Sequence, residues 1–92
     1  MANDRRRFEI AVQLAQDWLD LAREKPSSHT CRSARQAAEA ASIRAEGLRL
    51  GAAEQDLLHD LMVEAIRLDA HHAVVDDAIT AWLTAYGQFA GA

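Results

Sequence analysis

The chain has 92 residues, half of them hydrophobic, which is enough for one small domain with a modest core. Its formal net charge of −4 is uneven, because residues 1–50 carry +2 and residues 51–92 carry −6. The acidic second half argues against nucleic-acid binding, and no apolar stretch approaches the ~20 residues of a membrane span. We therefore expect a single domain over residues 1–92 that binds neither nucleic acid nor membrane.

Cys31 is the one cysteine, so no intramolecular disulfide is possible and a cytoplasmic location is expected. It lies beside a predicted helix start and two residues from His29, an arrangement that can favour a nucleophile. No further residue to orient the histidine and no oxyanion motif accompany the pair. We therefore expect an inert cysteine, no cofactor and no enzymatic activity.

The first predicted helix runs from about residue 4 to residue 24. Asn3 or Asp4 can cap its start, and Pro26 ends it because the residue before a proline avoids the helical region. The apolar residues of one face recur at helical spacing: Phe8, Ala11, Val12, Ala15, Trp18, Leu19 and Ala22. Three further apolar residues widen that face, as expected of a helix that touches two neighbours: Ile10, Leu14 and Leu21.

The second predicted helix runs from about residue 31 to residue 46, after a polar loop over residues 27–30 that offers several caps. Its inner face is almost entirely alanine: Ala34, Ala37, Ala38, Ala41 and Ala45. Small side chains allow helix axes to approach closely. Gly47 is placed to end this helix in the left-handed conformation, and Ile43 falls on the outer, polar face.

The most informative pattern is a long apolar seam in the second half of the chain. Its members recur at alternating spacings of four and three: Leu61, Ala65, Leu68, His72, Val75, Ile79, Trp82, Tyr86 and Phe89. Because the seam stays in phase and no glycine or proline interrupts residues 52–86, we favour one helix of roughly 50–55 Å over about residues 52–89. The alternative is a break near residues 69–73, which would make a four-helix bundle.

A single long third helix would extend past the two shorter ones, which span only about 25–30 Å each. The overhang would then expose four large side chains: Ile79, Trp82, Tyr86 and Phe89. A monomer rarely leaves so much apolar surface in water. These four residues are therefore the candidate partner-binding surface, and in the four-helix alternative they would instead be core.

One edge of the seam carries a histidine between two carboxylates, Asp69, His72 and Asp76, at spacings of three and four. Such residues can bind zinc or iron in helical bundles. Aspartate reaches less far than the glutamate of bundle sites, and the other predicted helices offer no matching inward ligands. We therefore expect solvated polar residues here and no metal, with these three as the weak candidates.

The sequence thus predicts an all-α fold, an antiparallel bundle of three helices with a long third. We expect a small non-enzymatic module that binds itself, as a homodimer, and another protein, possibly a basic one. It would act as a regulator, inhibitor or chaperone-like protein through its helix faces. Two alternatives remain open, an acidic nucleic-acid mimic that inhibits a nucleic-acid-binding enzyme, and a metal-binding helical bundle.

Overall fold

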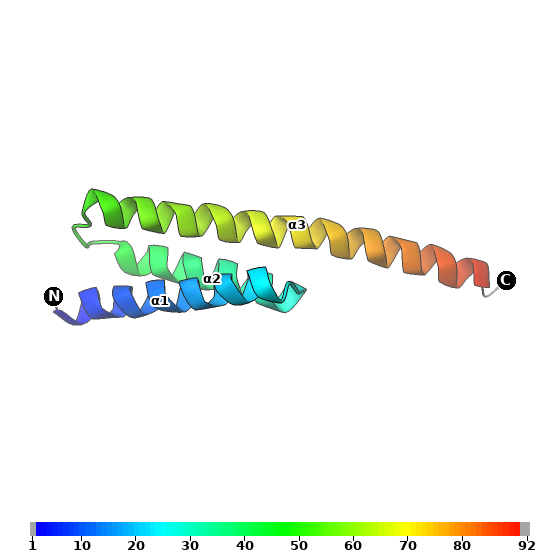
Figure 1. The fold of residues 1–92 in the computed structure, drawn as a ribbon, viewed down its shortest axis with the longest axis horizontal. Coiled ribbons are helices and arrows are strands. Elements are labelled where there is room, and N and C mark those ends of the chain that lie inside the picture. Colours follow the sequence, from blue (N-terminus) through cyan, green and yellow to red (C-terminus); the bar gives the residue numbers. More distant parts are fainter. Residues whose placement is uncertain (1, 91–92) are drawn as a thin grey trace.

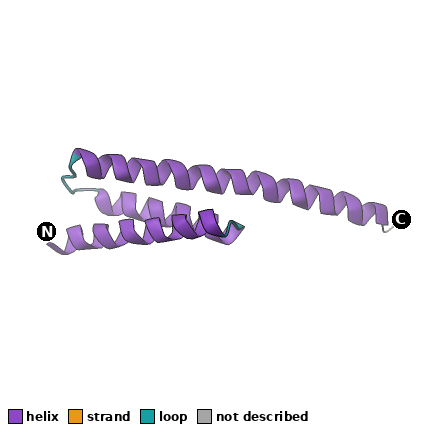
Figure 2. Ribbon diagram, in the orientation of Figure 1, coloured by secondary structure: helices purple, strands orange, loops and turns teal. Residues whose placement is uncertain are grey.

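A computed structural model of the chain describes residues 2–90, with side chains described over residues 3–87. This part of the chain forms three helices and no strand, α1 (Ala2–Glu24), α2 (Ser28–Ala45) and α3 (Ala52–Ala90) (Figure 2). α1 and α2 form an antiparallel hairpin, and α3 runs back along α2 in the direction of α1 (Figure 1). The predicted all-α arrangement of three helices with a long third is confirmed.

α2 begins three residues earlier than predicted, because Ser27 and Thr30 form a capping box. The Ser27 hydroxyl accepts a hydrogen bond from the Thr30 backbone N–H at 3.0 Å, and the Thr30 hydroxyl accepts one from the Ser27 N–H at 2.9 Å. Each side chain satisfies a backbone donor that the helix start leaves free. The segment predicted as a polar loop is therefore mostly the first turn of α2.

The core lies where α2 is packed between α1 and α3, which contact each other far less than they contact α2. Alanines of α2 make this close packing possible, with Ala34, Ala38 and Ala41 all at most 1% exposed. The buried apolar residues come from all three helices: Phe8, Val12, Ala15, Leu19, Ala22, Cys31, Ala34, Ala37, Ala38, Ala41, Leu61 and Ala65. Gly47 lies in the turn directly after α2 and has a φ of 81°, the left-handed conformation predicted for it.

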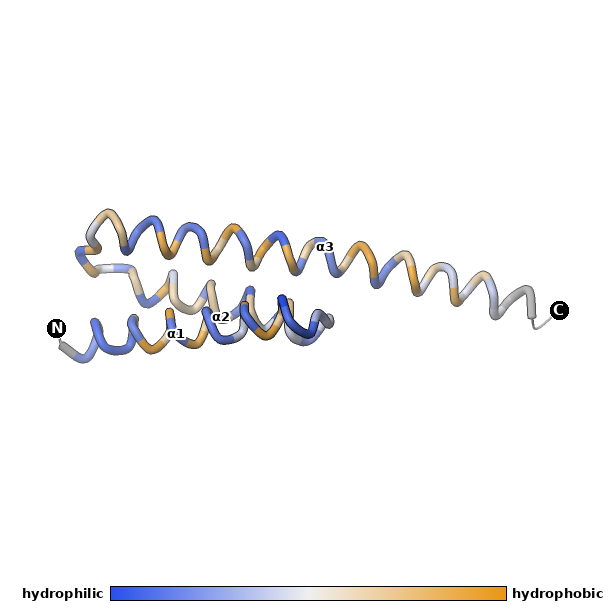
Figure 3. The backbone as a smooth tube through the Cα atoms, viewed as in Figure 1, coloured by the Kyte–Doolittle hydropathy of each residue, from blue (hydrophilic) through white to orange (hydrophobic). Residues whose placement is uncertain are grey.

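α3 is one unbroken helix of 39 residues, about 58 Å long at 1.5 Å per residue. The four-helix alternative with a break near residues 69–73 is therefore wrong. The helix passes through His71 and His72 without interruption, and no glycine or proline occurs between Gly51 and Gly87 to end it. Apolar residues continue along α3 beyond the hairpin (Figure 3).

The molecule is elongated, measuring 65 × 22 × 20 Å with a radius of gyration of 17.5 Å. A compact domain of this length has a radius of gyration of about 12 Å. The solvent-accessible surface is 6676 Å², whereas a compact 10.1 kDa monomer exposes about 5,300 Å². The chain therefore exposes roughly 1,400 Å² more than a compact monomer of its mass.

One expectation about α1 is wrong. Ile10, Leu14 and Leu21 were predicted to meet a second neighbour, but all three are exposed. The reason is that α3 packs mainly on α2, so nothing covers this side of α1. Ile43 of α2 is also exposed, as its position among polar residues predicted.

Candidate interaction surface

α3 leaves the hairpin at Asp76. Up to that residue, side chains of α2 bind polar side chains of α3. Arg35 NH1 donates to Asp69 Oδ2 at 2.8 Å, and the Ser28 hydroxyl donates to Asp76. Every described side chain from residue 77 to residue 87 is exposed. We call residues 77–90 of α3 the overhang.

Three large side chains of the overhang line up along one face, and we call Ile79, Trp82 and Tyr86 the overhang stripe. They are 52%, 64% and 60% exposed, respectively. The Trp82 and Tyr86 rings stack, with centroids 5.5 Å apart and planes 11° from parallel. The predicted exposure of these three residues is confirmed, and Phe89 lies outside the residues whose side chains are described.

Sequence reasoning missed two further exposed apolar residues of α3, Leu83 beside the stripe and Val74 before the overhang. Leu83 follows Trp82 directly and adds apolar surface on the flank of the stripe. The signal was present, because both are large apolar residues within a helix predicted to overhang. The seam pattern omitted them because they fall outside its alternation of three and four.

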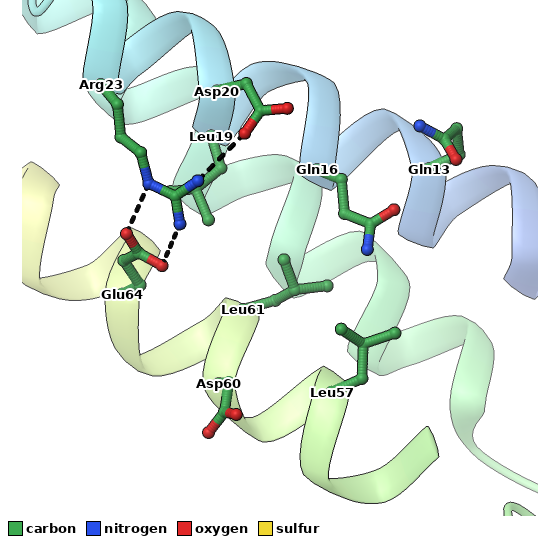
Figure 4. Close-up of a pocket in the computed structure, with 9 residues that line it drawn as sticks. All are labelled: Gln13, Gln16, Leu19, Asp20, Arg23, Leu57, Asp60, Leu61 and Glu64. Atoms are coloured by element: carbon green, nitrogen blue, oxygen red, sulfur yellow. Dashed lines mark hydrogen bonds and ion pairs between the residues drawn. The ribbon is translucent and has the colours of Figure 1, made fainter. Parts of the chain in front are cut away.

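A groove runs between α1 and α3, because both helices pack on α2 and leave a gap on the opposite side. Its larger hollow has a volume of about 370 Å³, and a second hollow of about 170 Å³ lies nearer the start of α1. The larger hollow is lined by residues of α1 and α3 only (Figure 4): Gln13, Gln16, Leu19, Asp20, Arg23, Leu57, Asp60, Leu61 and Glu64. Leu57 and Leu61 point from α3 toward α1 (Figure 4).

An ion pair joins the two helices at each end of this groove. Arg5 donates to Glu54 at one end, and also to Glu9 at 3.4 Å within α1. Arg23 donates to Glu64 at the other end, with 2.6 Å between Nε and Oε1. The two ion pairs thus bridge α1 and α3 across the groove, one at each end.

The start of α3 fixes Glu54 for its ion pair. Glu54 is the third residue of the helix, and its Oε1 also accepts the Gly51 backbone N–H at 3.2 Å. The hydrogen bond from Arg5, followed by that from Gly51, lowers the pKa of the Glu54 carboxyl below its ordinary value. Glu54 therefore acts both as a helix cap and as the acidic partner that closes this end of the groove.

The groove and the overhang stripe lie on the same face of α3. Eighteen residues make five turns of an α-helix, so residues eighteen apart lie directly in line. Leu61 of the groove is thus in line with Ile79, and Glu64 is in line with Trp82. The seam read from the sequence contained this face, but the groove beside it depends on how α1 packs and could not be found from spacing.

The structure brings two of the weak metal candidates, His72 and Asp76, together and pairs the third, Asp69, with an arginine. Asp69 is paired with Arg35, while His72 Nε2 lies 3.3 Å from Asp76 Oδ1. Among the described residues, no group of three or more histidine, cysteine, aspartate or glutamate side chains is placed to hold a metal ion. Cys31 is 1% exposed in the core, so it does not form part of an accessible site with His29.

No protein-family model, curated protein or solved structure matches this chain. Within residues 2–90, none of the helices combines the length and apolar character needed to cross a membrane.

Proposed function

We propose that this chain is a small, non-enzymatic protein–protein interaction module that works in the cytoplasm, as a homodimer and through contacts with another protein. The observation that carries the proposal is the exposure of the overhang stripe. Removing the exposed parts of Ile79, Trp82, Leu83 and Tyr86 from water is worth roughly 4–8 kcal/mol before the costs of association. Aromatic residues of this kind dominate the energetics of protein interfaces.

The charges near the stripe indicate the surface chemistry expected of a partner protein. Residues 78–87 carry no charged side chain, while Asp76 and Asp77 lie at the base of the overhang. For another protein that binds beside Asp76 and Asp77, a surface with basic residues at its rim fits this pattern, because opposite charges steer two proteins together. A regulator, inhibitor or chaperone-like protein would act through such a surface.

Nucleic-acid mimicry is the runner-up, and the ion pairs argue against it. A mimic needs a run of unpaired acids that imitates phosphates. Three of the seven acids in residues 51–92 are paired with arginines of the hairpin: Glu54 with Arg5, Glu64 with Arg23 and Asp69 with Arg35. The metal-binding alternative is disfavoured for a similar reason, because Asp69, one of its three candidate ligands, is paired with Arg35.

Site-specific photocrosslinking tests the proposal. A benzophenone side chain replaces Tyr86 on the stripe, and in a matched variant it replaces the exposed Ala81, which lies about 130–140° around the helix from Tyr86. Irradiation of cells that produce the full chain should give a covalent adduct with a polypeptide, either a second copy or another protein, from position 86 and much less from position 81. Equal yields from the two positions, or no adduct from either, would overturn the proposal.

A further inference from the structure

The geometry points to a specific occupant for the overhang, the groove between α1 and α3 of a second copy of this chain. We propose that two chains pair antiparallel along α3, so that each overhang stripe lies in the groove of the other chain. This inference rests on the proposed interaction function and gives that function a defined partner and orientation. Four observations support it, namely helical phase, length, exposed area and chemistry.

The first observation is phase. The stripe and the α3 wall of the groove lie on one line of the same helix, with Leu61 in line with Ile79 and Glu64 in line with Trp82. A two-fold axis brings a face of one chain against the same face of the other, reversed in direction. Antiparallel pairing through this face therefore places the stripe of each chain beside the groove of the other. The two stripe–groove contacts are identical because the two-fold axis relates them.

The second observation is length. The midpoint of α3 (Ala52–Ala90) is residue 71. Full antiparallel overlap around this residue places Trp82 opposite residue 60 of the second copy and Tyr86 opposite residue 56. These two levels fall within the α3 wall of the groove, which extends over both hollows from Glu54 to Glu64. On α1 the groove extends from Phe8 to Arg23, about 22 Å at 1.5 Å per residue, and the overhang has a similar length.

The resulting topology completes a bundle that the single chain leaves open. α1 and α3 run in one direction and α2 runs in the other (Figure 1). α1 and α3 hardly touch, as expected of helices that occupy diagonal positions of a four-helix bundle. An antiparallel overhang from the second copy occupies the fourth position and gives alternating helix directions.

The third observation is area. The chain exposes 6676 Å², an excess of roughly 1,400 Å² over a compact monomer of its mass. A stable protein–protein interface of standard size buries about 800 Å² per partner. The excess surface therefore suffices for such an interface, provided that each chain contributes both its overhang and its groove.

The fourth observation is chemistry. The α1 wall of the groove combines the polar Gln13, Gln16 and Asp20 with apolar side chains, which are Leu19 in the larger hollow and Phe8 and Val12 in the second. The indole N–H of Trp82 and the hydroxyl of Tyr86 are donors on otherwise apolar rings, and amide and carboxylate oxygens accept from them. An overhang without charge between residues 78 and 87 also adds no repulsion to this acidic groove. The exposed apolar residues of α1, such as Leu14, line neither hollow.

Distance measurements between spin labels test the orientation. The chain carries Cys31→Ala, since buried alanines already surround that position, and a single new cysteine replaces the exposed Ala85 or Ala70. The antiparallel overlap predicts about 40 Å between labels at position 85 in the two chains, and about 20 Å between labels at position 70. Circular dichroism of each labelled variant verifies that its helix content is retained.

Each other outcome contradicts the inference in a recognisable way. Labels at position 85 closer than about 20 Å would mean that the two overhangs pair tail to tail, outside the grooves. No intermolecular distance at high chain concentration would mean that the stripe does not bind a second copy. If photocrosslinking at position 86 still captures another protein, the self-pairing and the homodimer fail, while the proposed binding of another protein through the overhang stripe stands.

Discussion

Arg23, near the end of α1, makes a bidentate ion pair with Glu64 of α3. Its Nε donates to Oε1 at 2.6 Å and its NH2 donates to Oε2, while its NH1 reaches Asp20 at 3.0 Å (Figure 4). This pair, like that of Arg5 with Glu54, directly links two helices that otherwise contact each other little. It fixes one end of the groove that we assign to the partner's overhang.

A double-mutant cycle with Arg23→Ala and Glu64→Gln measures this link. Both side chains are nearly half exposed, so we expect a coupling free energy of about 0.5–1 kcal/mol at low salt. Urea unfolding at one fixed protein concentration provides the measurement, and 1 M salt should reduce the coupling. A coupling free energy of zero at low salt would mean that the pair does not hold the helices together.

Glu54 makes stability depend on pH in a defined direction. Its folded-state pKa is lowered by Arg5 and then by the Gly51 N–H. Its stabilisation is therefore complete above the ordinary glutamate pKa, about 4.3, and is lost as pH falls through the lower folded value. Wild type should melt above Glu54→Gln at pH 7, and the gap should close toward pH 3. The exposed Glu24, changed to Gln, is the control that should show no such gap, and a gap for Glu54→Gln that persists at low pH would contradict this role.

The capping box sets where α2 begins. Ser27→Ala removes the acceptor for the Thr30 N–H, and we expect a loss of about 1 kcal/mol in the free energy of unfolding. Ser27→Asp keeps an acceptor at the same place and should retain most of the stability. The two variants are compared by urea unfolding, and equal losses would show that the cap is not the cause.

The alanine face of α2 leaves no room for larger side chains. Ala41 is 0% exposed, so Ala41→Leu should lower the free energy of unfolding by about 1–3 kcal/mol through overpacking. Ala40 is its exposed neighbour on the same helix, and Ala40→Leu should change stability by less than about 0.5 kcal/mol. Thermal melts of both variants provide the measurement. Similar losses of stability in Ala41→Leu and Ala40→Leu would mean that the alanine face of α2 is not closely packed.

The long third helix and its exposed end were predictable because they follow from periodicity and length. Leu61, Ile79 and Trp82 share a helical face, and two helices of about 25–30 Å cannot cover one about twice as long. The start of α2 was misplaced because Thr30 works as a capping residue inside the first turn, and spacing alone does not reveal that role.

Which faces of the helices contact each other could not be predicted from the sequence, for a physical reason. A second helix was predicted to contact Ile10, Leu14 and Leu21. That contact required α3 to pack on their side of α1. In the folded chain α3 packs instead on the alanine face of α2 and contacts α1 little. The groove beside α3 depends on the same choice, so it appears only in the folded chain.

The most direct test of the central claim, that the overhang stripe joins two copies of this chain, is the molecular mass in solution. Light scattering over a range of concentrations should give twice the chain mass for wild type. Ile79→Ser should give a single chain, while Leu14→Ser should remain a dimer, although Ile79 and Leu14 are equally exposed at 52%. A wild-type protein that stays at the mass of one chain at every concentration would contradict the claim, as would an Ile79→Ser variant that remains a dimer.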